Sequence, residues 1–423
     1  MKVPTIDLKP HDRMMEVLEG MYRHRLEHPT SKSDELYYSL LLNYNRRIRD
    51  ALDKGSFIAG HQILIPPELF FGLDMVPMLL EFTCGTIVAS NKSYEEALSA
   101  AKSYGLPPEI CSAHRIMAAM FLKGWAPPPN VIMWSNTACE NEAKTGGTLA
   151  AAYGIPGLFL DRPYHHTEQA EEYLAEELED MVGRLEELSG HRMDYDRLGQ
   201  ALELSAEMTA LAQEIYELRR AVPSPLGNRR AIELWLVAWY SQGTHEAVDY
   251  YRQVRDELKA MIDEGRGAAQ HEKFRLISVL TAPFHAWKTL DWMEREHGAT
   301  IVADPDNAHW DNWELDLSRP YLSLARRAFV SPVIKHLNGP MTDMVTDLVE
   351  AVKTHQADGA IYFAHVGCRQ GCSAIRTIKD TLMEEAGIPT LALDCDFMDP
   401  TFVSEEETKD KIEAFLEMLE DRR

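Results

Sequence analysis

Apolar and polar positions follow two patterns along this chain, one typical of buried strands and one of amphipathic helices. Eight short apolar runs have strand length and are bounded by glycine, proline or polar residues. These predicted strands cover residues 60–65, 75–82, 130–134, 154–160, 274–280, 300–303, 360–363 and 388–393. Between them, apolar residues recur at steps of three and four, which predicts helices. The predicted helices cover residues 11–27, 31–54, 93–104, 166–188, 194–221, 228–240, 244–263, 286–297, 372–385 and 404–421, and others begin near residues 66, 107 and 140.

The order of these elements contains a low-level internal repeat. The series strand, cysteine-containing loop, helix, Gly-Ile-Pro and strand occurs at residues 130–160 and again at 360–393. Alternating strands and helices predict parallel sheets covered by helices. We therefore expect an α/β protein with two related parallel-sheet domains of flavodoxin-like type. The expected ranges are N-terminal helices at 1–56, a first α/β domain at 57–165, a helical region at 166–268 and a second α/β domain at 269–423.

Composition narrows the possible partners. Of the 423 residues, 45% are apolar and 26% are charged, which is typical of a globular protein. The net charge of −24 disfavours a nucleic-acid partner, because the phosphates would be repelled. The N-terminal segment has no apolar signal-peptide core, and the longest apolar run, 234–240, is too short to span a bilayer. We expect a cytoplasmic protein that acts on a small molecule and does not contact membranes.

Cysteines form the main candidate site. All six are predicted to lie in or beside loops that follow strands, and none falls in the central helical region: Cys84, Cys111, Cys139, Cys368, Cys372 and Cys395. The carboxyl ends of parallel strands form the ligand-binding edge of a sheet, and nearby helix N-termini stabilise the thiolate form that binds metal. A cluster of thiolates with few histidines favours an iron–sulfur centre over zinc, whose sites usually contain paired Cys-x₂-Cys knuckles. The alternative is a set of unrelated buried thiols.

Polar side chains next to these cysteines are candidates for moving protons or for hydrogen bonding to sulfur. The candidate catalytic residues are His114, Glu140, His365 and Arg369. Packing or salt bridges at the strand ends explain each of them equally well. The sequence contains neither G-x-x-x-x-G-K-[S/T] nor G-x-G-x-x-G after a strand, so any ATP that the chemistry needs must be hydrolysed by another protein.

Six stretches, each weak alone, together match a known family pattern. They are Pro66-Pro67-Glu68-Leu69 with Pro77, residues 111–115 (CSAHR), 135–139, 154–156 (GIP), 357–368 and 387–396. With these stretches the chain resembles, over nearly its whole length, the subunits of the 2-hydroxyacyl-CoA dehydratase and benzoyl-CoA reductase family. The resemblance implies a [4Fe-4S] cluster between the two α/β domains, with three cysteine ligands that match Cys111, Cys139 and Cys368. It also implies that a separate ATP-hydrolysing iron–sulfur activator delivers single electrons.

The other three cysteines, Cys84, Cys372 and Cys395, are additional to that pattern. Two bridged cubanes with three ligands each would use all six. The chain is similar in this respect to the double-cubane cluster proteins, a branch of the family whose members are homodimers that resemble reductases of small molecules. This resemblance implies an [8Fe-9S] double-cubane cluster.

Three hypotheses follow. The favoured one is a low-potential, anaerobic iron–sulfur reductase of the double-cubane type, fed with electrons by the activator. The second is a 2-hydroxyacyl-CoA dehydratase or benzoyl-CoA reductase subunit with a single [4Fe-4S] cluster, bound CoA thioester and a paralogous partner subunit. The third is a non-catalytic electron-storage subunit that has no substrate of its own.

Overall fold

The computed structural model of the chain describes residues 4–423, which divide into two compact units. The first unit contains the residues up to Thr209 together with 237–253 and 312–330, and the second contains 210–236, 254–311 and 331–423. Each unit is therefore assembled from segments that are far apart in sequence. The four consecutive domain ranges expected from the sequence stay a prediction.

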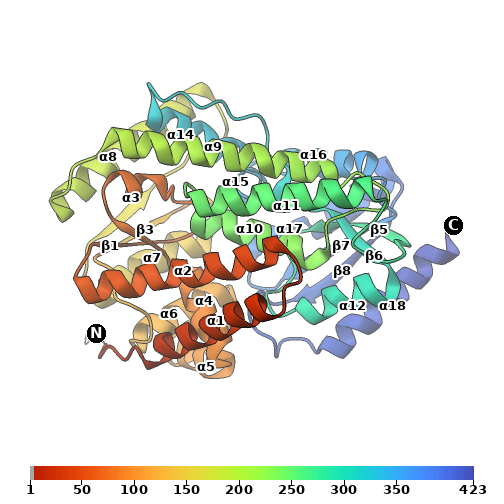
Figure 1. Cartoon of the computed structure of the whole chain (residues 1–423), viewed down its shortest axis with the longest axis horizontal. Coiled ribbons are helices and arrows are strands. Elements are labelled where there is room, and N and C mark those ends of the chain that lie inside the picture. The colour runs from red at the N-terminus through yellow and green to blue at the C-terminus, as the bar shows by residue number, and fades with distance from the viewer. Residues whose placement is uncertain (1–3) are drawn as a thin grey trace. The chain divides into compact units, whose positions relative to one another are not determined.

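Each unit contains one sheet of four parallel strands (Figure 1). The strands of the first sheet are β1 (Ile58–His61), β2 (Val76–Leu79), β3 (Val131–Ser135) and β4 (Gly157–Leu160). The strands of the second are β5 (Phe274–Val279), β6 (Ala299–Ala303), β7 (Gly359–His365) and β8 (Thr390–Cys395). The spatial orders are β2-β1-β3-β4 and β6-β5-β7-β8, so both sheets share one topology, as in the first four strands of a flavodoxin-like sheet. The prediction of two related α/β units is confirmed.

Helices make up most of the rest of the described chain. Those within the first unit are α1 (Lys9–Glu27), α2 (Lys32–Lys54), α3 (Glu68–Gly72), α4 (Leu80–Asn91), α5 (Tyr94–Ser103), α6 (Ser112–Leu122), α7 (Glu140–Tyr153), α8 (Glu168–Ser189) and α14 (Pro320–Val330). Those within the second are α12 (Trp287–His297), α13 (Pro305–Ala308), α15 (Pro332–Leu337), α16 (Met341–Thr354), α17 (Arg369–Ala386) and α18 (Glu405–Asp421). The boundary between the units falls within α9 (Tyr195–Leu218), α10 (Asn228–Ser241) and α11 (His245–Asp263). No helix of residues 4–423 is long and apolar enough to cross a membrane.

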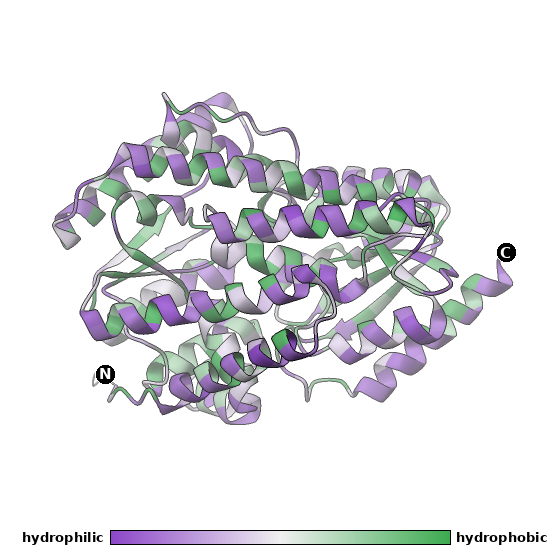
Figure 2. Cartoon of the chain, in the orientation of Figure 1, coloured by the Kyte–Doolittle hydropathy of each residue, from purple (hydrophilic) through white to green (hydrophobic). Residues whose placement is uncertain are grey.

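Local sequence signals explain where the long helices begin and end. The Ser31 hydroxyl accepts the N–H of Asp34 at 3.1 Å and caps α2, and Gly55 ends that helix in a left-handed conformation. Thr167 caps α8 in the same way. Along α1, α2 and α8, hydrophilic and hydrophobic residues alternate (Figure 2), so one side of each helix packs against its unit.

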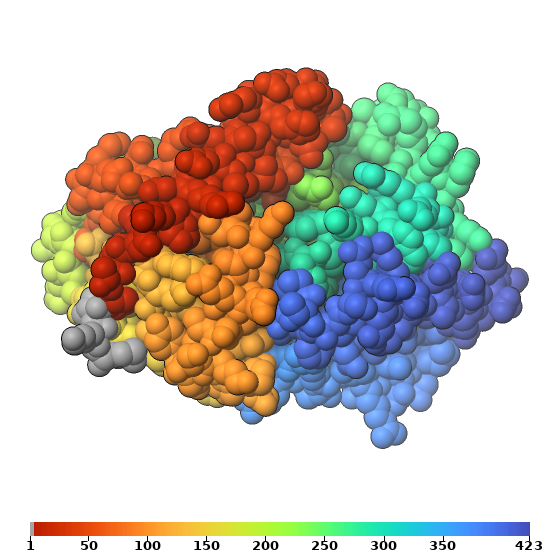
Figure 3. All heavy atoms as spheres, turned by 90° about the horizontal axis from the view of Figure 1, so that it is seen from below, coloured from red at the N-terminus to blue at the C-terminus, as the bar shows by residue number. Residues whose placement is uncertain are grey.

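In the first unit, α8 and α14 cover one face of the sheet. Leu158 and Leu160 of β4 pack with Leu174 and Leu178 of α8 in one buried cluster. On another side of the same unit, α1 packs against α4, and the space-filling view shows the N-terminal residues (red) beside the α4–α5 region (orange) (Figure 3). These helices cover the sheet of the first unit.

The structure differs from the sequence prediction in several places. The expected strand at 75–82 ends at Leu79, because the apolar run continues directly into the buried first turn of α4. The first strand begins two residues earlier than expected and ends at His61, and Leu64 after it has a left-handed backbone with φ 67°. Four helices that were not predicted, α13 to α16, occupy most of the stretch from 305 to 354.

Candidate metal centre

Cys139 and Cys368 occupy equivalent positions in the two units. Each follows the third strand of its sheet and is the N-cap residue of the next helix, α7 or α17. The sulfur of Cys139 accepts the N–H of Glu142 at 3.4 Å, and the sulfur of Cys368 accepts the N–H of Gly371 at 3.4 Å. β3 and β7 each neighbour the first strand of their sheet, where the strand order reverses and ligands bind in such folds. Helix N-termini also favour a negatively charged sulfur.

The first unit contributes two further cysteines, with different surroundings. Cys111 is the N-cap residue of α6, which begins at Ser112 and not near residue 107 as predicted. Cys84 was expected in a loop after a strand, and this prediction is wrong. It lies inside α4, fully buried, with its sulfur 4.0 Å from the carbonyl oxygen of Met117. Burial, with the nearby Glu81, raises the pKa of Cys84 well above its usual value.

His114 contacts Cys139. Its Nε2 atom lies 3.7 Å from the Cys139 sulfur, and its Nδ1 atom lies 3.0 Å from the hydroxyl oxygen of Thr145. The Thr145 hydroxyl donates its proton to the carbonyl oxygen of Asn141, and the side-chain amide nitrogen of Gln62 lies 3.0 Å from the Thr145 oxygen and 3.3 Å from Nδ1 of His114. Nε2 of His114 therefore faces the sulfur. Burial lowers the pKa of His114 to about 4, so its ring is neutral at pH 7.

The second unit repeats this pairing of histidine and cysteine. His365 and Cys395 lie opposite each other at the ends of β7 and β8, with 3.4 Å between Nδ1 of His365 and the sulfur. Nε2 of His365 donates to the carbonyl oxygen of Thr281 at 2.7 Å, which leaves Nδ1 unprotonated toward Cys395. Burial lowers the pKa of His365 to about 4 and raises the pKa of Cys395.

Cys372 lies close to Cys368 in the second unit. The N–H of Cys372 bonds to the carbonyl oxygen of Cys368 at 2.9 Å, because α17 begins at Arg369, earlier than the predicted residue 372. The two cysteines therefore lie one turn apart on the same side of the helix. The Cys372 thiol donates to the carbonyl oxygen of His365 at 3.2 Å. Cys368, Cys372 and Cys395 thus gather at the carboxyl edge of the second sheet.

The other two candidate catalytic residues lie on the surface. Glu140 forms an ion pair with Lys144 at 3.4 Å in the first turn of α7, and its side chain is 49% exposed. Arg369 is exposed at the first position of α17. The structure thus places His114 and His365 against cysteine sulfur, with Glu140 and Arg369 next to cysteines in sequence but facing solvent. Catalytic roles for all four stay predictions.

Two buried carboxyl groups beside the first set of cysteines were not predicted from the sequence. Glu142 accepts a hydrogen bond from the Ser135 hydroxyl at 2.8 Å, and burial raises its pKa well above the usual value. Burial also raises the pKa of Glu81 to about 8, and both of its carboxyl oxygens are inaccessible to solvent. The only sequence signal for them is an acidic residue in the first turn after an apolar strand, which is usually read as a helix-dipole contact.

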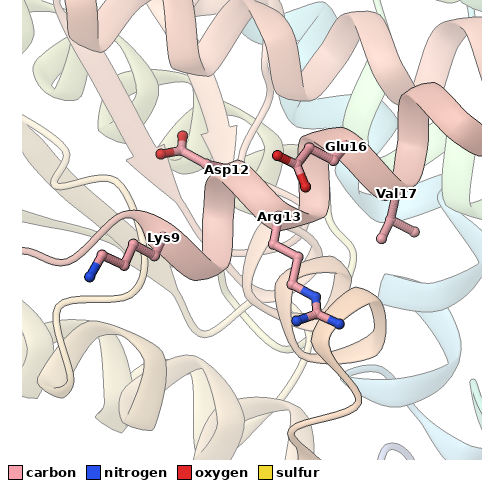
Figure 4. Close-up of a pocket in the computed structure, with 5 residues that line it drawn as sticks. All are labelled: Lys9, Asp12, Arg13, Glu16 and Val17. Carbon is pink, nitrogen blue, oxygen red and sulfur yellow. The ribbon is translucent and has the colours of Figure 1, made fainter.

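One surface depression, of about 510 Å³, lies along α1, and none of its described lining residues contains sulfur (Figure 4). Its described lining residues are Lys9, Asp12, Arg13, Glu16 and Val17. The charges of these described residues, two basic and two acidic, cancel. We assign it no functional role.

The cysteine groups suit thiolate ligands of an iron–sulfur cluster. All six cysteines are free thiols, three in each unit. Three of them are helix N-cap residues, and the sulfur atoms of Cys139 and Cys368 accept a backbone N–H there, although burial still raises the pKa of Cys368. Cys84, inside a helix, fits this role less well. Within residues 4–423, no three histidine, cysteine or acidic side chains already converge to hold a single metal ion.

Known proteins with similar sequences fall into one group of enzymes. The chain is 23% identical to a benzoyl-CoA reductase subunit of Thauera aromatica over 84% of this chain and 87% of that protein. It is 21% identical to the (R)-phenyllactyl-CoA dehydratase alpha subunit of Clostridium sporogenes over 78% of this chain and 82% of that protein. It is also 21% identical to the alpha subunit of lactoyl-CoA dehydratase of Anaerotignum propionicum, over 88% and 93% of the two chains. The model of the family described as 2-hydroxyglutaryl-CoA dehydratase, D-component, matches residues 62–419, and the chain belongs to that family.

Proposed function

We propose that this protein is a low-potential iron–sulfur reductase of small molecules that binds a double-cubane [8Fe-9S] cluster through Cys84, Cys111, Cys139, Cys368, Cys372 and Cys395. The observation that carries the proposal is the division of six free cysteines into two sets of three, one in each unit. Cys139 and Cys368 occupy matching positions in sheets of the same topology, which supports one half-site for each unit.

In this proposal the protein's own residues hold the cluster and shape its surroundings. The bound cluster would supply single electrons at low potential. Nε2 of His114 and Nδ1 of His365 lie beside a cysteine sulfur in the first and second unit respectively, and they set the polarity around these ligands. Glu140 and Arg369, which are exposed next to ligand cysteines, are the candidates for positioning or protonating a substrate.

Two kinds of partner belong to the proposal. A separate ATP-hydrolysing iron–sulfur protein would deliver the electrons, because the sequence contains no phosphate-binding loop of its own. The related proteins are named as subunits, which supports a second subunit here, either another copy of this chain or a paralogue.

A second candidate function is a dehydratase or benzoyl-CoA reductase subunit with one [4Fe-4S] cluster held by Cys111, Cys139 and Cys368. Two observations favour it. The names of the relatives given above state that they act on CoA thioesters. In addition, Cys84 is buried inside α4 and does not lie in a loop. A third candidate is an electron-storage subunit, which would hold a cluster without turning over any substrate.

Iron and acid-labile sulfide per chain, measured on protein purified without oxygen, test these candidates. About eight irons per chain are expected for the double cubane and about four for the single cubane. Serine variants then assign the ligands. Cys395→Ser and Cys372→Ser should each lose much of the iron if the cluster is double, and almost none if it is single. Cys139→Ser should lose iron in either case and serves as the positive control. No iron after anaerobic reconstitution of the wild type would refute both cluster proposals.

A further inference from the structure

A buried network of charged side chains lies among the helices of the second unit. Through Leu280 it reaches the first turn of α17, which carries Cys368 and Cys372. His336 of α15 lies between two carboxylates, with Nδ1 3.0 Å from Asp306 and Nε2 2.7 Å from Asp347. Lys335 bonds to Asp347 at 2.7 Å and to Asp311 at 2.8 Å. The His336 side chain is fully buried and the side chains of Asp306 and Asp347 are nearly so, which makes this network rigid and costly to break.

The inner end of this network holds an unusual backbone conformation. The second carboxylate oxygen of Asp306 accepts the N–H of Leu280 at 2.7 Å. Leu280 follows the last residue of β5 and has φ 59°, in the left-handed region that leucine rarely adopts. A residue in this region is strained and keeps its conformation only where its surroundings fix it. Here two bonds supply that constraint: the one to Asp306, and one from the Ser278 hydroxyl to the carbonyl oxygen of Leu280 at 2.5 Å.

The side chain of Leu280 packs against the first turn of α17. A Cβ atom placed on Gly371 would lie 2.6 Å from Cδ1 of Leu280 and 3.3 Å from the sulfur of Cys368. Gly371 is therefore enclosed between the leucine and the cysteine. Its carbonyl oxygen also accepts the hydroxyl proton of Tyr362, a fully buried residue of β7, at 2.5 Å. The first turn of α17, which carries Cys368 and Cys372, is thus fixed from two sides.

We infer that Asp306 and Leu280 are positioning residues for Cys368 and Cys372. Asp306 is held in place by His336 and Asp347, and it keeps Leu280 in the conformation that presses its side chain onto Gly371. The two sulfur atoms are then arranged before any cluster binds, which lowers the cost of ordering them at binding. The role of these thiols as ligands rests on the function proposed above, whereas the restraint on α17 is a property of the chain itself.

The test compares three changes at two aspartates in the full-length chain. Asp306→Ala removes the acceptor for the Leu280 N–H, Asp306→Asn keeps an acceptor oxygen, and Asp311→Asn changes only the outer end of the network. The readout is the alkylation rate of Cys368, followed by mass spectrometry before cluster insertion. We expect Asp306→Ala to raise this rate about tenfold through local opening of the first turn of α17. Asp306→Asn should restore most of the protection, and Asp311→Asn should match the wild type.

A second variant covers the case in which Asp306→Ala does not fold. Leu280→Gly removes the contacting side chain and also relieves the left-handed strain, so the fold should persist while Cys368 becomes more reactive. After anaerobic reconstitution, the electron paramagnetic resonance spectrum of the reduced cluster should change in Leu280→Gly and not in Asp311→Asn. Unchanged Cys368 alkylation in both Leu280→Gly and Asp306→Ala would overturn the inference. A wild-type protein without iron would refute the proposed function and leave the alkylation result standing.

Discussion

Nε2 of His336 lies 2.7 Å from a carboxylate oxygen of Asp347, and the histidine side chain is closed off from solvent. Burial lowers the pKa of His336, but the carboxylates of Asp306 and Asp347 on either side of the ring outweigh it and raise the pKa to about 9. The folded protein therefore keeps a charged histidine in its interior at neutral pH.

The stability of the protein should decrease above neutral pH for this reason. A histidine whose folded pKa is raised from 6.5 to about 9 contributes its full stabilisation below pH 6.5 and loses it as the pH rises to 9. The loss should amount to a few kcal/mol, measured by urea unfolding between pH 6 and 9. His336→Gln should lack this part of the pH dependence, and His271→Gln, at an exposed position, should retain it. An identical slope in His336→Gln and wild type would show that the ion pairs do not form.

The buried ion pair between Glu68 and Arg327 should behave as a unit. One guanidinium nitrogen of Arg327 lies 3.1 Å from Glu68 Oε2, another bonds closely to Oε1, and the Ser205 hydroxyl donates to Oε1 at 2.5 Å. Arg327→Met leaves the carboxylate unpaired and should cost about 3–5 kcal/mol in the free energy of unfolding. The double variant Glu68→Gln/Arg327→Met should recover much of this loss. A double-mutant cycle measures the coupling, and additive losses would contradict the expectation.

Glu81 should destabilise the fold at alkaline pH. Burial raises its pKa from 4.5 to about 8, which means that the folded protein favours the protonated carboxyl group. The stability linked to this proton is fully present below pH 4.5 and is lost as the pH rises to 8. Relative to the wild type, Glu81→Gln should therefore gain stability progressively between pH 5 and 8, reaching a few kcal/mol. Chemical unfolding at each pH measures the difference. Glu140→Gln is the control, because that carboxyl group is half exposed. A Glu81→Gln variant that is less stable than the wild type at pH 8 would mean that Glu81 is ionised and paired.

α7 packs so closely on Trp134 that an added methyl group at the contact should destabilise the protein. A Cβ atom on Gly146 would lie 2.4 Å from Cβ and Cγ of Trp134. Gly146→Ala should therefore lower the free energy of unfolding by about 1–3 kcal/mol through overpacking. Gly183→Ala in α8 is the matched control, since a Cβ there meets nothing within 4 Å and should stabilise the helix by about 1 kcal/mol. Thermal unfolding of both variants gives the comparison, and equal melting temperatures would contradict it.

The two parallel sheets and most helices could be predicted because their signals are local. The run NVIMW at 130–134 and the amphipathic pattern at 404–421 identify a buried strand and a helix with no knowledge of their neighbours. The cysteine loops after β3 and β7 followed from the same reasoning, and Cys139 and Cys368 lie there. Where an apolar run covers both a strand and a buried helix turn, as at 75–82, periodicity cannot locate the boundary, and Cys84 was misplaced for that reason.

Interactions across long sequence separations could not be predicted. The sequence around Glu68 gives no sign of its partner Arg327, which is 259 residues away. His336 and Asp306 gave no pattern in the sequence, because a buried charge is recognisable only once its partners are placed around it. The restraint on Leu280 is likewise a tertiary effect, since nothing in the local sequence favours a left-handed leucine.

Because the first unit is assembled from separate segments of the chain, it can complete its fold only late in synthesis. The unit includes residues 312–330, so it cannot be completed until these residues leave the ribosome. At about 5–20 residues per second, the 259 residues between Glu68 and Arg327 correspond to a delay on the order of tens of seconds. During that time the nascent chain carries Glu68 without its arginine and the apolar face of α8 without α14. A stop codon between residues 190 and 319 would release a chain that contains every strand of the first sheet and all of α8 but lacks α14, so that its hydrophobic core stays open.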